Sequence, residues 1–204
     1  MSELPIPYYT EDEYLELDRA SDIKYEYIDG FIHAMSGGSA SHSAIAANIT
    51  GELTSRLRGR CRVYQSDLKV ATGSRLYAYP DVSVVCETPR FRDQSEDTLL
   101  NPLLIVEVLS PSTESRDRGR KSILYRQIES LIDYVLVSQH IPFVELYHRN
   151  PDGEWVYRSA YGVDESIRLP SVGLVLRLAD IYDLVSVPPT ETEKPNDDRD
   201  DRLI

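Results

Sequence analysis

The hydrophobic positions of this chain recur with two periods, and each period predicts a different kind of element. Ile45, Ile49, Leu53 and Leu57 lie four residues apart, which places their side chains on one face of a helix. The run LLIVEVLS at residues 103–110 is almost entirely apolar, as in a strand that is covered on both faces. Together the two patterns predict a helix packed against a buried sheet.

The N-terminal region predicts a helix followed by a β-hairpin. Thr10 and Glu13 have the spacing of a capping box at the start of TEDEYLEL. An Asp-Gly pair at residues 29–30 then separates two alternating runs, which is a strong signal for a two-residue hairpin turn. A hairpin closed at this turn places Glu26 opposite His33 on the same face.

The rest of the chain predicts strands and helices in mixed order. A helix is expected at about residues 116–128, a short helix within residues 169–185, and a loop at residues 87–101. These elements predict an α/β or α+β domain with one central mixed sheet flanked by helices. The predicted strands are residues 61–70, 77–86, 103–110, 133–139, 143–149 and 154–161.

Composition divides the chain into a domain and a tail. The 204 residues, of which 41% are hydrophobic, are enough for one globular domain, which we place at residues 1–187. Residues 188–204 are rich in Pro and Asp, so we expect them to be disordered. No apolar run approaches the roughly 20 residues that span a bilayer, and no signal-peptide pattern is present. We therefore expect a cytoplasmic protein without a membrane segment.

The two cysteines, Cys61 and Cys86, both lie inside predicted strands. Buried free thiols in a reducing compartment fit this pattern better than the alternative, a disulfide between them. The sequence therefore predicts two reduced cysteines.

The net charge of −12 argues against a polyanionic partner until its distribution is considered. Residues 1–30 carry a net charge of −7 and residues 188–204 carry −3, which leaves −2 for the body of the chain. Within the body, Arg56–Arg62 and Arg116–Lys121 are locally basic. Such runs form either phosphate-contacting surfaces or ordinary solvated faces.

A glutamate in the middle of an aliphatic strand is the clearest chemical signal in the sequence. Burial of the Glu107 carboxylate without a partner costs several kcal/mol or forces its protonation, so we expect a Lys, an Arg or a metal ion beside it. A second carboxylate, Asp81, directly follows Pro80 at the start of VSVVC. Proline fits the first residue of a strand or an edge, and a kink there would turn Asp81 inward.

The helix that follows Glu107 supplies a basic partner. Lys121, Leu124, Tyr125 and Ile128 have i, i+3, i+4 and i+7 spacing, so Lys121 shares the face that packs on the sheet. Asp117 lies four residues earlier on the same stripe and is expected to pair with it. These groups would form either a structural ion-pair network or a site for a divalent cation such as Mg²⁺.

Two further side chains are candidates for supporting roles. His42 opens the second helix three residues before Ile45, where it is either a hydrogen-bonded boundary residue or a hydrogen-bond partner for a phosphate or a metal-bound water. Tyr125 follows Lys121 by one turn, so it packs the helix on the sheet with its hydroxyl free to support the site.

Several other chemistries are disfavoured by missing patterns. The sequence has no Gly-rich phosphate loop after a strand, no GxSxG, no CxxC and no HExxH spacing. Its four histidines, at positions 33, 42, 140 and 148, form no zinc pattern. A nucleotide-hydrolysing motor and a zinc enzyme are therefore both disfavoured.

The same residues carry a resemblance to a known family. Pro80-Asp81 followed by Glu107-Val108-Leu109 resembles the short motif of the PD-(D/E)xK nuclease superfamily. A longer series of segments resembles the Uma-type restriction endonuclease family over roughly residues 8–185. The segments are YEYIDG, His42, YPDVSVV, LIVEVLSPST and DRGRKSILYRQ.

The resemblance implies a restriction-endonuclease-like fold and metal-dependent hydrolysis of DNA. Asp81 and Glu107 would hold Mg²⁺ or Mn²⁺, with the carbonyl of Val108 as a further ligand, and Glu26 would be an auxiliary acid. The chain departs from the superfamily pattern at Leu109, where a lysine is expected. Lys121 would be the substitute, and a homodimer is expected because cutting a duplex commonly uses two active sites.

A second interpretation belongs to a different class of function. A nuclease-like scaffold that no longer cleaves would serve as a nucleic-acid or protein binding module, and the acidic body and Leu109 favour it. The joint presence of Asp81, Glu107 and Lys121 favours the enzyme, because a binding module has no chemical need for them.

Overall fold

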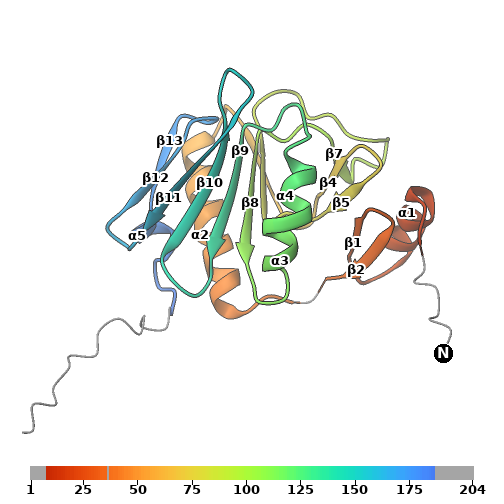
Figure 1. The fold of residues 1–204 in the computed structure, drawn as a ribbon, viewed down its shortest axis with the longest axis horizontal. Coiled ribbons are helices and arrows are strands. Elements are labelled where there is room, and N and C mark those ends of the chain that lie inside the picture. Colours follow the sequence, from red (N-terminus) through yellow and green to blue (C-terminus); the bar gives the residue numbers. More distant parts are fainter. Residues whose placement is uncertain (1–7, 36, 187–204) are drawn as a thin grey trace, which may run out of the picture.

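The strands of the computed structural model, which describes residues 8–35 and 37–186, form two mixed sheets and a separate hairpin. Helix α2 (Ala40–Leu57) lies on one face of the larger sheet, and the short helices α3 (Glu114–Arg116) and α4 (Ser122–Tyr125) lie on the opposite face (Figure 1). This mixed α/β architecture agrees with the predicted fold class, but two mixed sheets take the place of the single central sheet that the sequence predicted.

The six-stranded sheet has the order β11-β10-β9-β8-β6-β3. The pair β8 and β9 is parallel, and the other neighbours in this sheet are antiparallel. The predicted strands at 103–110, 133–139, 143–149 and 154–161 are confirmed in it. Its members are β3 (Arg62–Gln65), β6 (Val82–Val85), β8 (Leu104–Leu109), β9 (Asp133–Ser138), β10 (Phe143–Arg149) and β11 (Trp155–Tyr161).

The five-stranded sheet has the order β2-β1-β5-β4-β7, and its short strand β7 lies within the predicted loop at residues 87–101. The predicted hairpin is confirmed, with Glu26 opposite His33. Helix α1 (Glu11–Ala20) begins with the predicted capping box and packs tyrosine and leucine side chains on this sheet. The strands are β1 (Tyr25–Ile28), β2 (Phe31–Ala34), β4 (Lys69–Thr72), β5 (Leu76–Ala78) and β7 (Thr98–Leu99).

The core on either side of the larger sheet follows the alternation of its strands. The stripe Ile45, Ile49, Leu53 and Leu57 of α2 is at most 1% exposed, as its spacing predicts, and packs on one face of the sheet. Leu124 and Tyr125 of α4 pack on the other face. The burial of these apolar side chains on both faces of the sheet is the dominant contribution to the stability of the fold.

Two predicted strands each prove to be two strands in different sheets. Residues 61–70 divide into β3 and β4, with a turn between them, and residues 77–86 divide into β5 and β6. At the second division Pro80 has no N–H to donate to a ladder, so pairing in the first sheet ends just before it. The chain crosses from one sheet to the other at both points.

The predicted helix at residues 116–128 is shorter and interrupted. It consists of α3 (Glu114–Arg116), a π-helical turn η1 (Asp117–Lys121) and α4 (Ser122–Tyr125). Gly119 has φ −95° and ψ −105°, outside the helical region, so the helix is bent at this residue.

The C-terminal part of the described chain contains a hairpin that the sequence pattern did not predict, β12 (Ser166–Leu169) and β13 (Leu174–Arg177). Each strand has only four residues, which is too short for its alternation of apolar and polar residues to give a clear signal. The predicted short helix is confirmed as α5 (Leu178–Ile181). The predicted disordered tail lies outside the described residues. Within residues 8–35 and 37–186, no helix combines the length and the hydropathy needed to cross a bilayer.

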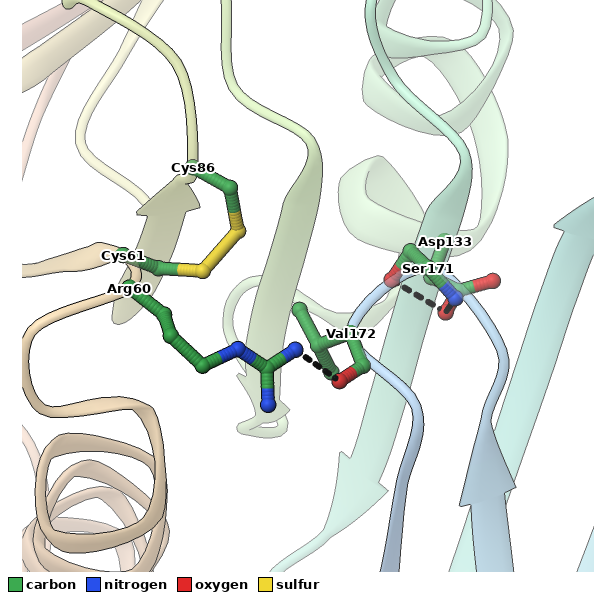
Figure 2. Close-up of a disulfide and its surroundings, with 6 residues drawn as sticks. All are labelled: Arg60, Cys61, Cys86, Asp133, Ser171 and Val172. Carbon is green, nitrogen blue, oxygen red and sulfur yellow. Dashed lines mark hydrogen bonds between the residues drawn. A yellow bond between two sulfur atoms is a disulfide. The ribbon is translucent and has the colours of Figure 1, made fainter.

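The prediction of two free thiols is wrong, because Cys61 and Cys86 form a disulfide with an S–S distance of 2.02 Å (Figure 2). The antiparallel register of β3 and β6 pairs Arg62 with Val85, which brings the preceding and following residues face to face. The two cysteines therefore give no support for a reducing compartment. The sequence pattern could not show this pairing because it depends on the register of two strands.

Candidate active site

Glu107 lies in β8, and its side chain points to the face that α4 covers. Side chains alternate along a strand, so Glu107 shares this face with Ile105 and Leu109, which pack with the residues of α4. Glu107 is 4% exposed, as predicted. A carboxylate removed from water to this degree needs a positive partner.

That partner is Lys121, as the spacing of the following helix predicts. Its Nζ lies 2.8 Å from Glu107 Oε1, 2.8 Å from Glu26 Oε1 and 2.9 Å from Asp117 Oδ1. The ammonium donates a hydrogen bond to Glu26, whereas Oδ1 of Asp117 has no hydrogen-bond partner among the described residues. One buried cation is thus shared by three buried carboxylates.

The π-helical turn brings Lys121 and Asp117 to the same side. The extra residue in the turn and the bend at Gly119 leave these two side chains paired, as their separation by four residues predicts. Tyr134 of β9 donates a hydrogen bond of 2.9 Å to the carbonyl of Asp117, which holds the start of the turn against the sheet. Such turns inside helices are frequent at functional sites.

Glu26 comes from the other sheet. It lies in β1, opposite His33 of β2, and is 4% exposed. Its contact with Lys121 joins the N-terminal hairpin to the helix that follows β8. The predicted proximity of Glu26 to the other candidates therefore agrees with the structure.

Asp81 stands where the chain passes from the five-stranded to the six-stranded sheet, directly after Pro80. Its Oδ2 accepts a hydrogen bond of 2.7 Å from the N–H of Val108 and lies 3.3 Å from Nε2 of His42. His42 lies in the first turn of α2, where its backbone N–H donates a hydrogen bond of 3.1 Å to the hydroxyl of the N-cap residue Ser39. Asp81 is thereby tied to the residue that follows Glu107.

Tyr125 is fully buried between α4 and the sheet, and its hydroxyl donates a hydrogen bond of 3.1 Å to Oε1 of Glu107. The predicted packing role and the predicted direction of the hydroxyl both agree with this contact. The same oxygen of Glu107 therefore faces both the phenol and the ammonium of Lys121.

The cluster holds a negative charge that its own residues do not neutralise. Burial raises the pKa of Glu107 well above its ordinary value; Lys121 opposes this rise, and Asp117 adds to it. Burial disfavours the charged form of Lys121, yet Glu107 and Glu26 outweigh burial and raise its pKa well above the usual range. Lys121 therefore stays protonated at neutral pH and cannot accept a proton there.

The neighbouring carboxylates also affect the pKa of His42. A hydrogen bond to Asp81 raises the pKa of His42 above its ordinary value, against the opposing effect of burial, and the backbone of Val108 contributes in the same direction. The protonated form of the imidazole is therefore favoured beside the carboxylates.

All the candidate residues except Tyr125 line a common cleft of about 440 Å³. A second cleft of about 650 Å³ continues along α2 and shares His42, Asp81 and the glycines at 37–38 with the first. A Cβ atom at Gly38 would lie only 2.9 Å from Nδ1 of His42, so the backbone passes closely over the imidazole. The side chains of the first cleft that carry charge include Glu26, His42, Asp81, Glu107, Arg116, Asp117 and Lys121.

Comparison with known proteins places the chain in a family. The model of the family described as "Uma2: Putative restriction endonuclease" matches residues 11–179. The chain belongs to the Uma2 family. The predicted resemblance to Uma-type proteins is thus confirmed.

Two curated relatives of the Uma2 chain come from Synechocystis sp. The protein named "Uncharacterized protein slr1290" is 41% identical over 180 residues, which cover 87% of this chain and 93% of the relative. The protein named "Uncharacterized protein sll1609" is 34% identical over 160 residues, with coverage of 78% and 90%. The similarity therefore extends over nearly the whole length of each relative.

A solved structure supports the fold. The crystal structure of a putative nuclease belonging to DUF820, from Anabaena variabilis, has a TM-score of 0.71 and 23% sequence identity. The superposed region covers 85% of this chain and 97% of the Anabaena chain. The two proteins therefore share the overall fold.

The donor chemistry of this Uma2 protein fits a hard divalent cation. Among residues 8–35 and 37–186, no group of three His, Cys, Asp or Glu side chains is arranged to hold a metal ion by itself. Mg²⁺, however, commonly binds through one or two carboxylates and keeps several waters. Asp81 and Glu107 supply two carboxylates, and beside them one ammonium is shared by three carboxylates, which leaves an excess of negative charge.

Sequence reasoning missed part of the site. GGSASHS predicted only a chain break and a helix start, whereas Gly37 and Gly38 line both clefts. The usable signal was the pair of glycines next to a capped helix that carries His42. Arg116 also lines the first cleft, and its signal was the basic run that it begins.

Proposed function

We propose that this Uma2 protein is a metal-dependent endonuclease that hydrolyses DNA phosphodiester bonds. The observation that carries the proposal is the sharing of one buried lysine by Glu26, Glu107 and Asp117 at the wall of a cleft. A cluster with this excess of negative charge has a physical use for a divalent cation. Family membership supports the same reaction class.

Asp81 and Glu107, with the carbonyl of Val108, are the residues that would hold Mg²⁺ or Mn²⁺. The bound cation would supply charge neutralisation for the phosphate oxygens and acidify a water. Glu26 accepts a hydrogen bond from the ammonium of Lys121, and the hydroxyl of Tyr125 donates one to Oε1 of Glu107. These contacts hold both side chains in place.

Lys121 acts as a positioning cation in this proposal. Because its pKa is raised, it keeps its proton, so it orients a water by donating hydrogen bonds and stabilises negative charge in the cleft. Leu109 stands at the position of the motif lysine, is 3% exposed and packs in the apolar core, so it cannot supply a charge to the site. Lys121 takes the place of the motif lysine in this proposal. The raised pKa favours the protonated form of His42 next to Asp81, which is suited to donate a hydrogen bond to a phosphate oxygen.

A binding module remains the second candidate, and the specific observation in its favour is Leu109. An aliphatic side chain at the motif position is what the loss of catalysis would leave behind. Such a module would bind nucleic acid or protein without cutting, and its affinity would not need a divalent ion.

Calorimetric titration of Mn²⁺ tests the proposal, together with plasmid nicking in the presence and absence of EDTA. We expect wild type to bind Mn²⁺ and to nick DNA only with a divalent ion. The variant Asp81→Asn/Glu107→Gln should lose both properties, and the control Asp97→Asn, which changes a carboxylate outside the cleft, should keep both. Metal-independent DNA retention without nicking would favour the binding module.

The proposed enzyme would act as a homodimer, since two sites cut the two strands of a duplex. Sedimentation velocity under cleaving conditions should give twice the mass of the chain. A monomer that cuts both strands at the same rate would contradict this part of the proposal.

A further inference from the structure

The basic run Arg116–Lys121 contains one residue that is not neutralised by a carboxylate. Arg118 pairs with Glu114 and Glu145, and Arg120 pairs with Asp29. Arg116 differs from both, since no carboxylate of the described residues lies within 4.0 Å of its guanidinium.

The guanidinium of Arg116 is also incompletely hydrogen-bonded. Its Nε is buried and has no partner within residues 8–35 and 37–186. A buried donor left without an acceptor loses its hydration and gains nothing in return, and this cost is larger for a charged group. An acceptor supplied by a ligand removes this cost.

Arg116 forms part of the wall of the first cleft. It is the last residue of α3 and lines the cleft together with Ser112, Thr113 and Lys121. Ala34, the last residue of β2, lines the same cleft as Arg116, and the charge of Arg116 lowers the pKa of His33 on that strand, after the larger effect of burial. Arg116 thus occupies the wall between the SPST segment and the hairpin.

We propose that Arg116 binds a backbone phosphate of the nucleic-acid substrate. The guanidinium offers planar, paired donors that match two phosphate oxygens, and it is the arginine of its run without a carboxylate partner in the described structure. The carboxylates of the cleft repel a polyanion, so an unneutralised cation beside them is what holds the strand. This inference rests on the proposed function for the identity of the ligand.

The role is substrate binding, which gives it a readout that does not depend on cleavage. Each phosphate contact by a cationic side chain releases counterions, so the loss of one contact lowers the slope of log Kd against log salt by about 0.9 for duplex DNA. Anisotropy of a labelled duplex in EDTA, at several salt concentrations, measures this slope.

We expect Arg116→Gln to lower the slope by about 0.9 and to weaken binding by about tenfold, the effect of one charge-assisted hydrogen bond. Arg116→Lys should restore the slope, because it keeps the charge, while its affinity stays below that of wild type. The control is Arg168→Gln on β12, which removes an exposed arginine outside both clefts and should leave the slope unchanged.

An unchanged slope in Arg116→Gln, in a protein with the far-UV circular dichroism of wild type, would overturn the inference. Its failure is distinct from failure of the proposed function. Wild type that nicks DNA while Arg116→Gln keeps the full slope refutes the phosphate contact alone. Wild type that binds without nicking, with a lower slope in Arg116→Gln, refutes the nuclease and keeps the contact.

Discussion

Two lysines of this protein are buried to the same extent but in different company. The side chains of Lys69 and Lys121 are both 3% exposed. Lys69 binds Asp18 at 2.8 Å and Asp97 at 3.2 Å. The carboxylate of Asp18 also accepts hydrogen bonds from Tyr79 and from the N–H of Tyr25, so its capacity is filled by the protein.

The cluster around Lys121 is not closed in this way. Three carboxylates share its ammonium, Oδ1 of Asp117 has no hydrogen bond within the described chain, and the group lines a cleft. Burial of a lysine with acids therefore does not identify function by itself. The balance of charge and access to a cleft distinguish the structural cluster from the candidate site.

The largest effect is expected from opening the structural cluster. Lys69→Met leaves the buried charge of Asp18 without its cation, so the free energy of unfolding should fall by about 3–5 kcal/mol. Urea denaturation measures the loss. The nicking rate per folded molecule should stay close to that of wild type, since Lys69 lies outside both clefts.

The partner variant controls this result. Asp18→Asn in the Lys69→Met background removes the stranded charge and should recover part of the lost stability, so the two effects should not add. Strict additivity of the two substitutions would show that the pair is not coupled, and the description of this cluster as structural would fail.

The same substitution at the other lysine should act on the rate. Lys121→Met removes the positioning cation, and we expect the rate of metal-dependent nicking to fall by about 10²–10³-fold, as for other buried charge-stabilising donors. The rate is measured per folded molecule, with the folded fraction taken from circular dichroism. Equal rate losses in Lys69→Met and Lys121→Met would erase the distinction between the clusters.

A divalent cation should stabilise only the cluster with excess charge. At a hundredfold excess over Kd, Mn²⁺ should raise the free energy of unfolding by about 2.7 kcal/mol, and the melting temperature by about 5–10 °C. Removal by EDTA should reverse the shift. Asp81→Asn/Glu107→Gln should abolish the shift, whereas Asp97→Asn should keep it. A shift that survives in the double variant would place the metal elsewhere.

Local patterns predicted the parts of the site that depend on one segment. The apolar neighbours of Glu107 predicted its burial, the stripe shared with Tyr125 predicted the direction of Lys121, and the Asp-Gly turn predicted the pairing of Glu26 with His33. Each of these follows from a period of 2 or 3.6 residues within a short stretch.

Contacts between distant segments could not be predicted in this way. The disulfide depends on the register of β3 and β6, and the network of Lys69 joins residues from α1, β4 and the segment before β7. The division of two predicted strands between two sheets depends on which edges lie nearby. None of these arrangements leaves a periodic signal in the sequence.

The smallest expected effect concerns acid pH at the edge of the structural cluster. The hydrogen bond from Arg19 holds the pKa of Asp97 below its ordinary value, with further help from Thr98 and Lys69. A carboxyl group whose folded pKa is lowered stabilises the fold above its unfolded pKa of about 3.9, and this contribution is lost as the pH falls toward the folded pKa. Asp97→Asn lacks the contribution at every pH.

The difference in unfolding free energy between wild type and Asp97→Asn should therefore be constant from pH 7 to about pH 5 and shrink below about pH 4. Urea denaturation at a series of pH values measures it. Because the Asp97 side chain is 28% exposed, solvent screening keeps the effect small. A difference that grows on acidification would mean that the carboxylate is held in the neutral form, and the cluster of Lys69 would then lack the charge balance that sets it apart from the cluster of Lys121.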